Sequence, residues 1–88
     1  MSKHTPGPWK ESKNVMEQPV IESVRPDNDA FIICQTFGPD KHDNARLIAA
    51  APDLLEVLRW TARALHAEHP AAIKARAAIA KATGEDEA

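Results

Sequence analysis

The middle of the chain reads DNARLIAAAPDLLEVL, from Asp43 to Leu58. Apolar residues recur there at spacings of three and four, which is the period of a helix that buries one face. The stripe consists of Leu47, Ala51, Leu54, Leu58, Ala62 and Leu65. Proline normally interrupts a helix, yet the stripe keeps its phase across Pro52. We therefore expect either a kinked helix or two abutting helices that share one buried face.

Strand signals precede this helical stretch. Residues 19–24 and 30–37 are rich in β-branched and aromatic side chains. They flank a turn signal at residues 25–29, so the pair predicts an antiparallel hairpin. Residues 9–16 form a weaker candidate for a third strand. Phe31, Ile33 and Phe37 share one strand face, which we expect to meet the helices.

The C-terminal part predicts one more helix. Pro70 should stop the long helix near His69 and begin the last helix, and Gly84 should end it. We expect this helix to pack through Ile73, Ala77 and Ala80. The predicted fold is α+β: a hairpin or three-stranded sheet packed on a Pro-kinked long helix and a short Ala-rich helix. Residues 1–84 form the single predicted domain, with a strand layer at 1–40, a helical layer at 43–84 and an acidic tail at 85–88.

Composition limits the function classes. The 88 residues carry a formal net charge of −2, which argues against sequence-independent binding to nucleic acid. No run is long and apolar enough for a membrane span, and no apolar leader follows Met1. The lone cysteine, Cys34, fits a reducing compartment, and burial in an apolar strand makes it an inert thiol. We expect a cytoplasmic protein. With so few large side chains, homo-oligomerisation or partner binding is also plausible.

Candidate chemistry is sparse. His66 and His69 could share a metal ion, but a helix C-terminus also favours a histidine there, and no further ligands lie nearby. The cluster Asp40, His42 and Asp43 suggests acid–base chemistry, but helix capping explains it better because no nucleophile accompanies it. The sequence therefore predicts no catalytic residue, no metal site and no cofactor.

The residues that stand out as a binding surface are Arg59, Trp60 and Arg63, because Arg and Trp are enriched at interface hot spots. The alternative is that Glu56 pairs with Arg59 or Arg63 on a solvated helix face. Together with Arg46, these arginines could instead bind an anionic nucleotide. The predicted partner-binding set is Arg46, Arg59, Trp60 and Arg63.

Two blocks of sequence carry a resemblance: HTPGPW at residues 4–9 and NARLIAAAPDLLE at residues 44–56. Together they resemble small bacteriophage and prophage proteins that have an HTPGPW opening, a variable β-rich middle and an NARLIAAAP(D/E)LLE helix. The resemblance implies a phage accessory protein in the bacterial cytoplasm and transfers no catalytic residue. Small phage accessory proteins often inhibit host machinery, so we expect a non-enzymatic binder of a host protein, such as an anti-CRISPR-like inhibitor of a defence complex. The alternatives are an oligomeric binder of an anionic nucleotide and a purely structural assembly component.

Overall fold

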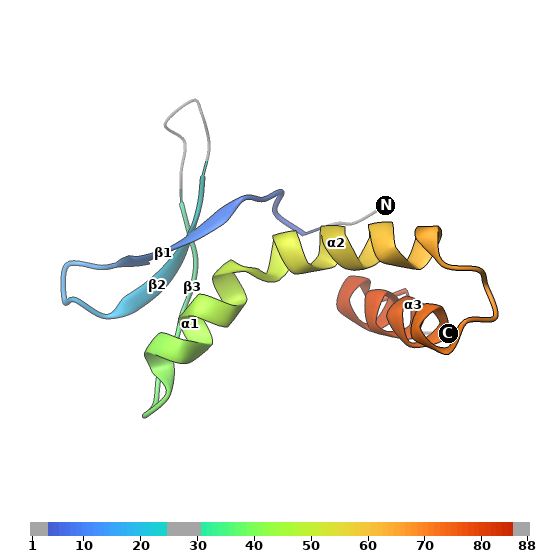
Figure 1. Cartoon of the computed structure of the whole chain (residues 1–88). Coiled ribbons are helices and arrows are strands. Elements are labelled where there is room, and N and C mark those ends of the chain that lie inside the picture. The colour runs from blue at the N-terminus through green and yellow to red at the C-terminus, as the bar shows by residue number, and fades with distance from the viewer. Residues whose placement is uncertain (1–3, 25–30, 86–88) are drawn as a thin grey trace. The chain divides into compact units, whose positions relative to one another are not determined.

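The computed structural model describes residues 4–24 and 31–85. Within these ranges, strands come first and helices follow (Figure 1). The strands are β1 (Trp9–Lys13), β2 (Pro19–Ser23) and β3 (Ile32–Gln35), and the helices are α1 (Lys41–Ala49), α2 (Ala51–Ala64) and α3 (Pro70–Thr83). This architecture confirms the predicted α+β class.

The strands form one antiparallel sheet in the order β1-β2-β3, which confirms the three-stranded alternative. Trp9 lies opposite Ser23 at one end of the β1–β2 ladder. The turn between these strands is held by Asn14, whose Oδ1 accepts hydrogen bonds from the backbone N–H groups of Met16 (2.9 Å) and Gln18 (3.0 Å). An Asn side chain in this role stabilises a tight turn. The turn predicted at residues 25–29 lies outside the described residues.

A bulge interrupts the pairing of β2 with β3. Ile21 pairs with Cys34, but the next residue, Glu22, pairs with Ile32. Such a bulge shifts the alternation of side chains between the two faces. The expectation that Phe31 and Phe37 meet the helices is wrong, since 44% of Phe31 and 75% of Phe37 are exposed. A periodic reading of β3 cannot anticipate this shift, because the bulge depends on the pairing partner.

The core of this part of the molecule is the central strand. The residues of β2 that are fully buried are Pro19, Val20, Ile21 and Ser23. Helix α1 packs against β1 and β2, and its buried residue is Ala45, whose small side chain permits a close approach. The Thr36 hydroxyl donates a hydrogen bond to the Lys41 carbonyl (2.7 Å), which ties the end of β3 to the start of α1. Asp40 occupies the predicted N-cap position, although its side chain makes no capping hydrogen bond.

The long apolar stripe forms two helices that meet at Ala50, which confirms the abutting alternative. Pro52 is the second residue of α2, where its missing N–H costs no intrahelical hydrogen bond. The prediction that both helices bury one shared face is wrong, because Leu47 is 64% exposed and Leu54 is 54% exposed. Helix α1 instead turns the face containing Ala45 inward, since only that small residue fits closely against the sheet.

The chain before β1 lies against the start of α2. A Cβ atom added to Gly7 would lie 2.7 Å from the Cβ of Pro52, so only a glycine fits without displacement. Trp9, in β1, is half-buried, and its indole N–H donates to the Thr5 carbonyl (3.1 Å). The HTPGPW block and the helical block therefore meet in the structure.

Helix α2 ends at Ala64, five residues before the predicted end at His69. The residues between the helices reverse the chain. The residue directly before Pro70 has the expected extended backbone, with φ −64° and ψ 131°. The predicted start at Pro70 is confirmed, as is the end at Gly84, whose φ of 77° is left-handed. The predicted packing face is wrong: Ala72 and Ala75 are buried, whereas Ile73 is 53% exposed.

The chain divides into two compact units. Within the described residues, one unit is formed by the part of Thr5–Asp53 that the structure describes, and the other by His4 and residues 54–85. Helix α1 thus belongs with the sheet, although the sequence places it in a helical layer. The single domain over residues 1–84 stays a prediction. Of the predicted acidic tail, only Glu85 is described, and its N–H donates to the Ala80 carbonyl (2.9 Å).

Candidate functional site

The outer face of α2 carries a row of exposed apolar side chains. Leu54, Val57 and Trp60 follow one another at spacings of three, and they are 54%, 60% and 68% exposed. Residues three apart lie on the same side of a helix. No residue of α2 is fully buried. Trp60 therefore belongs to the surface, as the sequence suggested for a binding residue.

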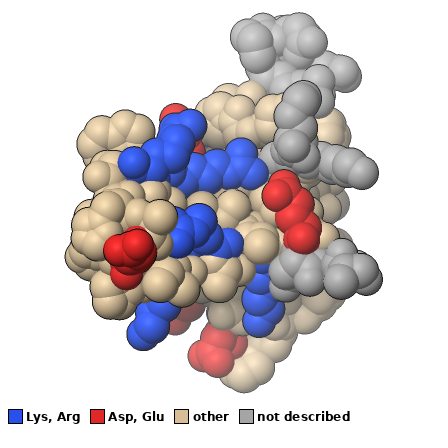
Figure 2. Space-filling model, turned by 90° about the vertical axis from the view of Figure 1, so that its right-hand side faces the viewer, with Lys and Arg blue, Asp and Glu red and all other residues tan. Residues whose placement is uncertain are grey.

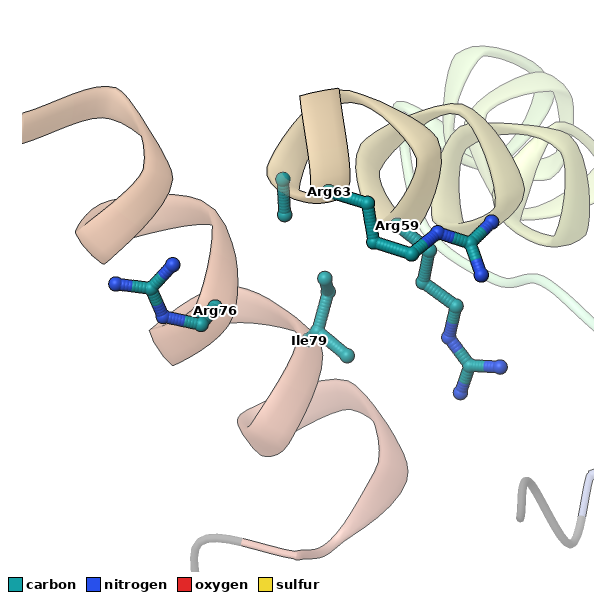
Figure 3. Close-up of a pocket in the computed structure, with 5 residues that line it drawn as sticks. Arg59, Arg63, Arg76 and Ile79 are labelled. Atoms are coloured by element: carbon teal, nitrogen blue, oxygen red, sulfur yellow. The ribbon is translucent and has the colours of Figure 1, made fainter. Parts of the chain in front are cut away.

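Arg59 and Arg63 lie one helical turn apart, beside this row. They line a pocket of about 370 Å³ between α2 and α3, and the other lining residues are Ala62, Arg76 and Ile79 (Figure 3). Arg59 is half-buried and Arg63 is exposed. In Figure 3, the guanidinium groups of Arg59 and Arg63 extend from α2 to the same side of Ile79. Three arginines and two apolar residues thus line the pocket, and two of the arginines come from α2.

Arg76 has a different role from the other two arginines. Its side chain extends from α3 away from the Arg59 and Arg63 guanidinium groups (Figure 3). Its Nη2 donates a hydrogen bond of 2.6 Å to the carbonyl of Ala67, in the connection between the helices. This bond ties the connection to α3 and engages the Arg76 guanidinium with the backbone.

The structure brings together three of the four predicted partner-binding residues. Arg59, Trp60 and Arg63 share α2, whereas Arg46 lies on α1 in the unit that contains the sheet. Arg46 forms an ion pair with Asp43 (Nη1 to Oδ1, 3.6 Å), and both side chains are more than two-thirds exposed. An exposed pair of this kind contributes about 0–1 kcal/mol to stability.

The family assignment rests on a match to nearly the whole chain. A protein family described as Salmonella phage P22 protein Y8K6 matches residues 1–86. The chain belongs to this family. The match confirms the predicted kinship with small phage proteins, while the part played by the two sequence blocks stays a prediction. No curated protein and no solved structure gives a significant match.

In this Y8K6 family member, the predicted pairing of Glu56 with an arginine is not formed. Within residues 4–24 and 31–85, neither Arg59 nor Arg63 makes an ion pair with a carboxylate. The face in Figure 2 carries basic and acidic side chains close to one another. The two arginines of the pocket are therefore cationic groups with no acidic partner among the described residues.

His66 and His69 of this family member lie at the connection between α2 and α3. His69 is the N-cap of α3, and its Nδ1 accepts a hydrogen bond from the Ala71 N–H (3.0 Å). The role predicted for it at a helix C-terminus is wrong, because α2 ends earlier. The rings of His66 and His69 contact each other edge-on, with centroids 5.5 Å apart. Across the described part of the chain, no three His, Cys, Asp or Glu residues are grouped to hold a metal ion.

Two further observations concern residues outside the pocket. Cys34 is half-buried in β3, so it is less enclosed than the sequence suggests. None of the helices described has both the length and the apolar character that crossing a bilayer requires.

Ile79 and Arg76 were not predicted to lie beside Arg59. A partial signal for them exists, because a short connection makes two successive helices run back along each other. The last helix therefore runs back toward Arg59. Arg59 lies six residues before the turn at residues 65–69 and Ile79 ten residues after it, so counting from the turn does not single out Ile79 or Arg76.

Proposed function

We propose that this Y8K6 family member is a non-enzymatic accessory protein that binds a host protein in the bacterial cytoplasm. Binding would inhibit a host defence complex, as anti-CRISPR proteins do. The observation that carries the proposal is the exposed row Leu54, Val57 and Trp60 on α2, with Arg63 beside it. Membership of a phage protein family supports a role in a bacterial host.

The row has the composition of an interface centre. Trp and Arg are the residue types most enriched among the side chains that dominate binding energy. A tryptophan with 68% of its surface exposed gains hydrophobic stabilisation when a partner covers it, at about 25 cal/mol per Å² of apolar area. Glu56 and Arg63 lie seven residues apart along one side of the row and carry opposite charges, which would orient the partner along the helix.

The test is affinity capture from a bacterial lysate with tagged protein, followed by mass spectrometry. We expect a specific host complex to be captured by the native chain. Trp60→Ala combined with Arg63→Ala should reduce the capture at least tenfold, since removing a hot-spot residue costs about 2 kcal/mol or more. Circular dichroism should show that the variant keeps its secondary structure.

The matched control is Phe37→Ala. Phe37 is an equally exposed aromatic residue, at 75%, but it lies in the unit that contains the sheet. It should leave capture unchanged. If Phe37→Ala weakened capture as much as the α2 variant, or if the α2 variant captured normally, the α2 surface would not be the binding site.

A further inference from the structure

The two arginines on the pocket side of α2 are an unusual pair for a helix surface. Arg59 and Arg63 lie four residues apart, where like charges repel and destabilise the helix. Glu56 lies one turn before Arg59, yet among the described residues it forms no ion pair with either arginine. An anion placed between the two guanidinium groups would remove this repulsion.

The pocket offers more than charge. Ala62 and Ile79 supply an apolar floor beside the two guanidinium groups (Figure 3). Its volume of about 370 Å³ lies near the lower end of the range for small-molecule pockets, roughly 300–1,000 Å³. Arg76 hydrogen-bonds the Ala67 carbonyl and thereby holds one wall of the pocket in place. The site therefore suits a small ligand with one anionic end and one less polar end.

We propose that Arg59 and Arg63 bind the phosphate group of a small phosphomonoester, such as a nucleoside monophosphate, whose remaining part lies on Ala62 and Ile79. A phosphomonoester carries a charge of about −1.5 to −2 at neutral pH and offers three acceptor oxygens. Two guanidinium groups can each donate to different oxygens of one phosphate. A single carboxylate has only two oxygens and one charge, so it matches one arginine better than two.

This proposal concerns the side of α2 that faces α3. It shares Arg63 with the host-protein surface around Trp60, but Trp60 does not line the pocket, and Arg59 and Ile79 are not part of that surface. Trp60→Ala and Arg59→Gln, each made alone, therefore separate the two proposals.

The test is isothermal titration calorimetry of the native chain at low salt. The probes are adenosine 5′-monophosphate, inorganic phosphate, adenosine and succinate, each at up to about 10 mM, which detects affinities in the millimolar range. We expect the monophosphate to bind most tightly, inorganic phosphate more weakly, and adenosine and succinate weakest. Raising the salt concentration should weaken monophosphate binding, because exposed charges are screened.

Arg59→Gln and Arg63→Gln should each weaken monophosphate binding at least about tenfold, as expected when a charge-assisted contact is lost. Lys10→Gln is the control, because it removes one positive charge from an exposed position on β1, outside the pocket. It should leave the affinity unchanged. Circular dichroism and thermal melting would verify that all three variants are folded.

Four results would overturn the proposal. The first is no detectable binding of the monophosphate to the folded native chain, and the second is succinate binding as tightly as the monophosphate. The third is inorganic phosphate binding as tightly as the monophosphate, which would remove the role of the apolar floor. The fourth is Lys10→Gln weakening binding as much as the pocket variants, which would indicate non-specific attraction.

Discussion

At the scale of single residues, two isoleucines on neighbouring strands differ in how much of their surface is exposed. Ile21 on β2 has 0% of its surface exposed, whereas Ile32 on β3 has 54% exposed. Ile21 lies in the central strand, which has a partner strand on each side. The contribution of an isoleucine to stability here therefore depends on its strand rather than on its residue type.

We predict that Ile21→Ala lowers the free energy of unfolding by about 2–5 kcal/mol, because it removes buried methyl groups and leaves a cavity. Ile32→Ala, the matched control, should lower it by less than about 1 kcal/mol, since exposed positions contribute little. Urea unfolding followed by circular dichroism measures both. Equal losses for the two variants would contradict the burial seen in β2.

Residues whose effect is local could be predicted from the sequence. Pro52, Pro70 and Gly84 occupy the expected positions because the conformations of proline and glycine depend mainly on their own backbone. Leu47 and Leu54 could not be assigned correctly, because their burial depends on which helix face meets the sheet. Helical periodicity predicts which residues share an apolar face of a helix, but it does not predict which face packs against the sheet.

At the scale of elements, α3 begins with an uncommon cap. His69 accepts the Ala71 N–H through its imidazole, where Ser, Thr, Asp or Asn is the usual choice. No acidic residue lies in the first turn of α3 to complement the helix dipole. The start of α3 is therefore a place where a substitution can improve the helix.

We predict that His69→Asp stabilises α3 by about 0.5–1 kcal/mol, because a carboxylate both caps the free N–H groups and favours the positive end of the dipole. His69→Ala should destabilise it by a similar amount. Thermal unfolding followed by the helical signal in circular dichroism measures the change. Glu68→Ala, in the same exposed connection, is the control and should have little effect; a fall in stability with His69→Asp would argue against the capping role.

For the candidate site, the sequence predicts the residues on α2 but not those on α3. The pairing of Arg59 with Arg63 follows from their spacing on one helix, and the exposure of Trp60 follows from its place beside the apolar stripe. The approach of Ile79 requires knowing where α2 ends, and the predicted end at His69 was five residues too late. Because the end of α2 was misplaced, the two lining residues on α3, Arg76 and Ile79, were not predicted.

At the scale of the whole molecule, burial is distributed unevenly between the two units. The fully buried side chains of the Thr5–Asp53 unit include Val20 and Ile21, whereas the described part of the other unit buries only the small residues Ala72 and Ala75. Hydrophobic stabilisation scales with the apolar area removed from water. The unit with α3 therefore has less of it.

We predict that amide hydrogens in α2 and α3 exchange with solvent at least about tenfold faster than those of β2, because local opening costs least where little apolar surface is buried. Native-state hydrogen exchange measured by NMR tests this directly. Comparable protection across both units would show that the helices gain stability from contacts beyond their own buried alanines. Binding of a ligand or partner on α2 should slow exchange there selectively.

The meeting of Gly7 with Pro52 has a consequence for how this chain can diversify. These residues belong to the two recognisable sequence blocks, and their close approach brings together the ends of the whole intervening segment. An insertion between fixed ends costs little closure entropy, which grows only with the logarithm of loop length. The strands can therefore lengthen, shorten or change their surface while the contact between Gly7 and Pro52 is kept. A new recognition surface can arise on the strands without a change in this contact.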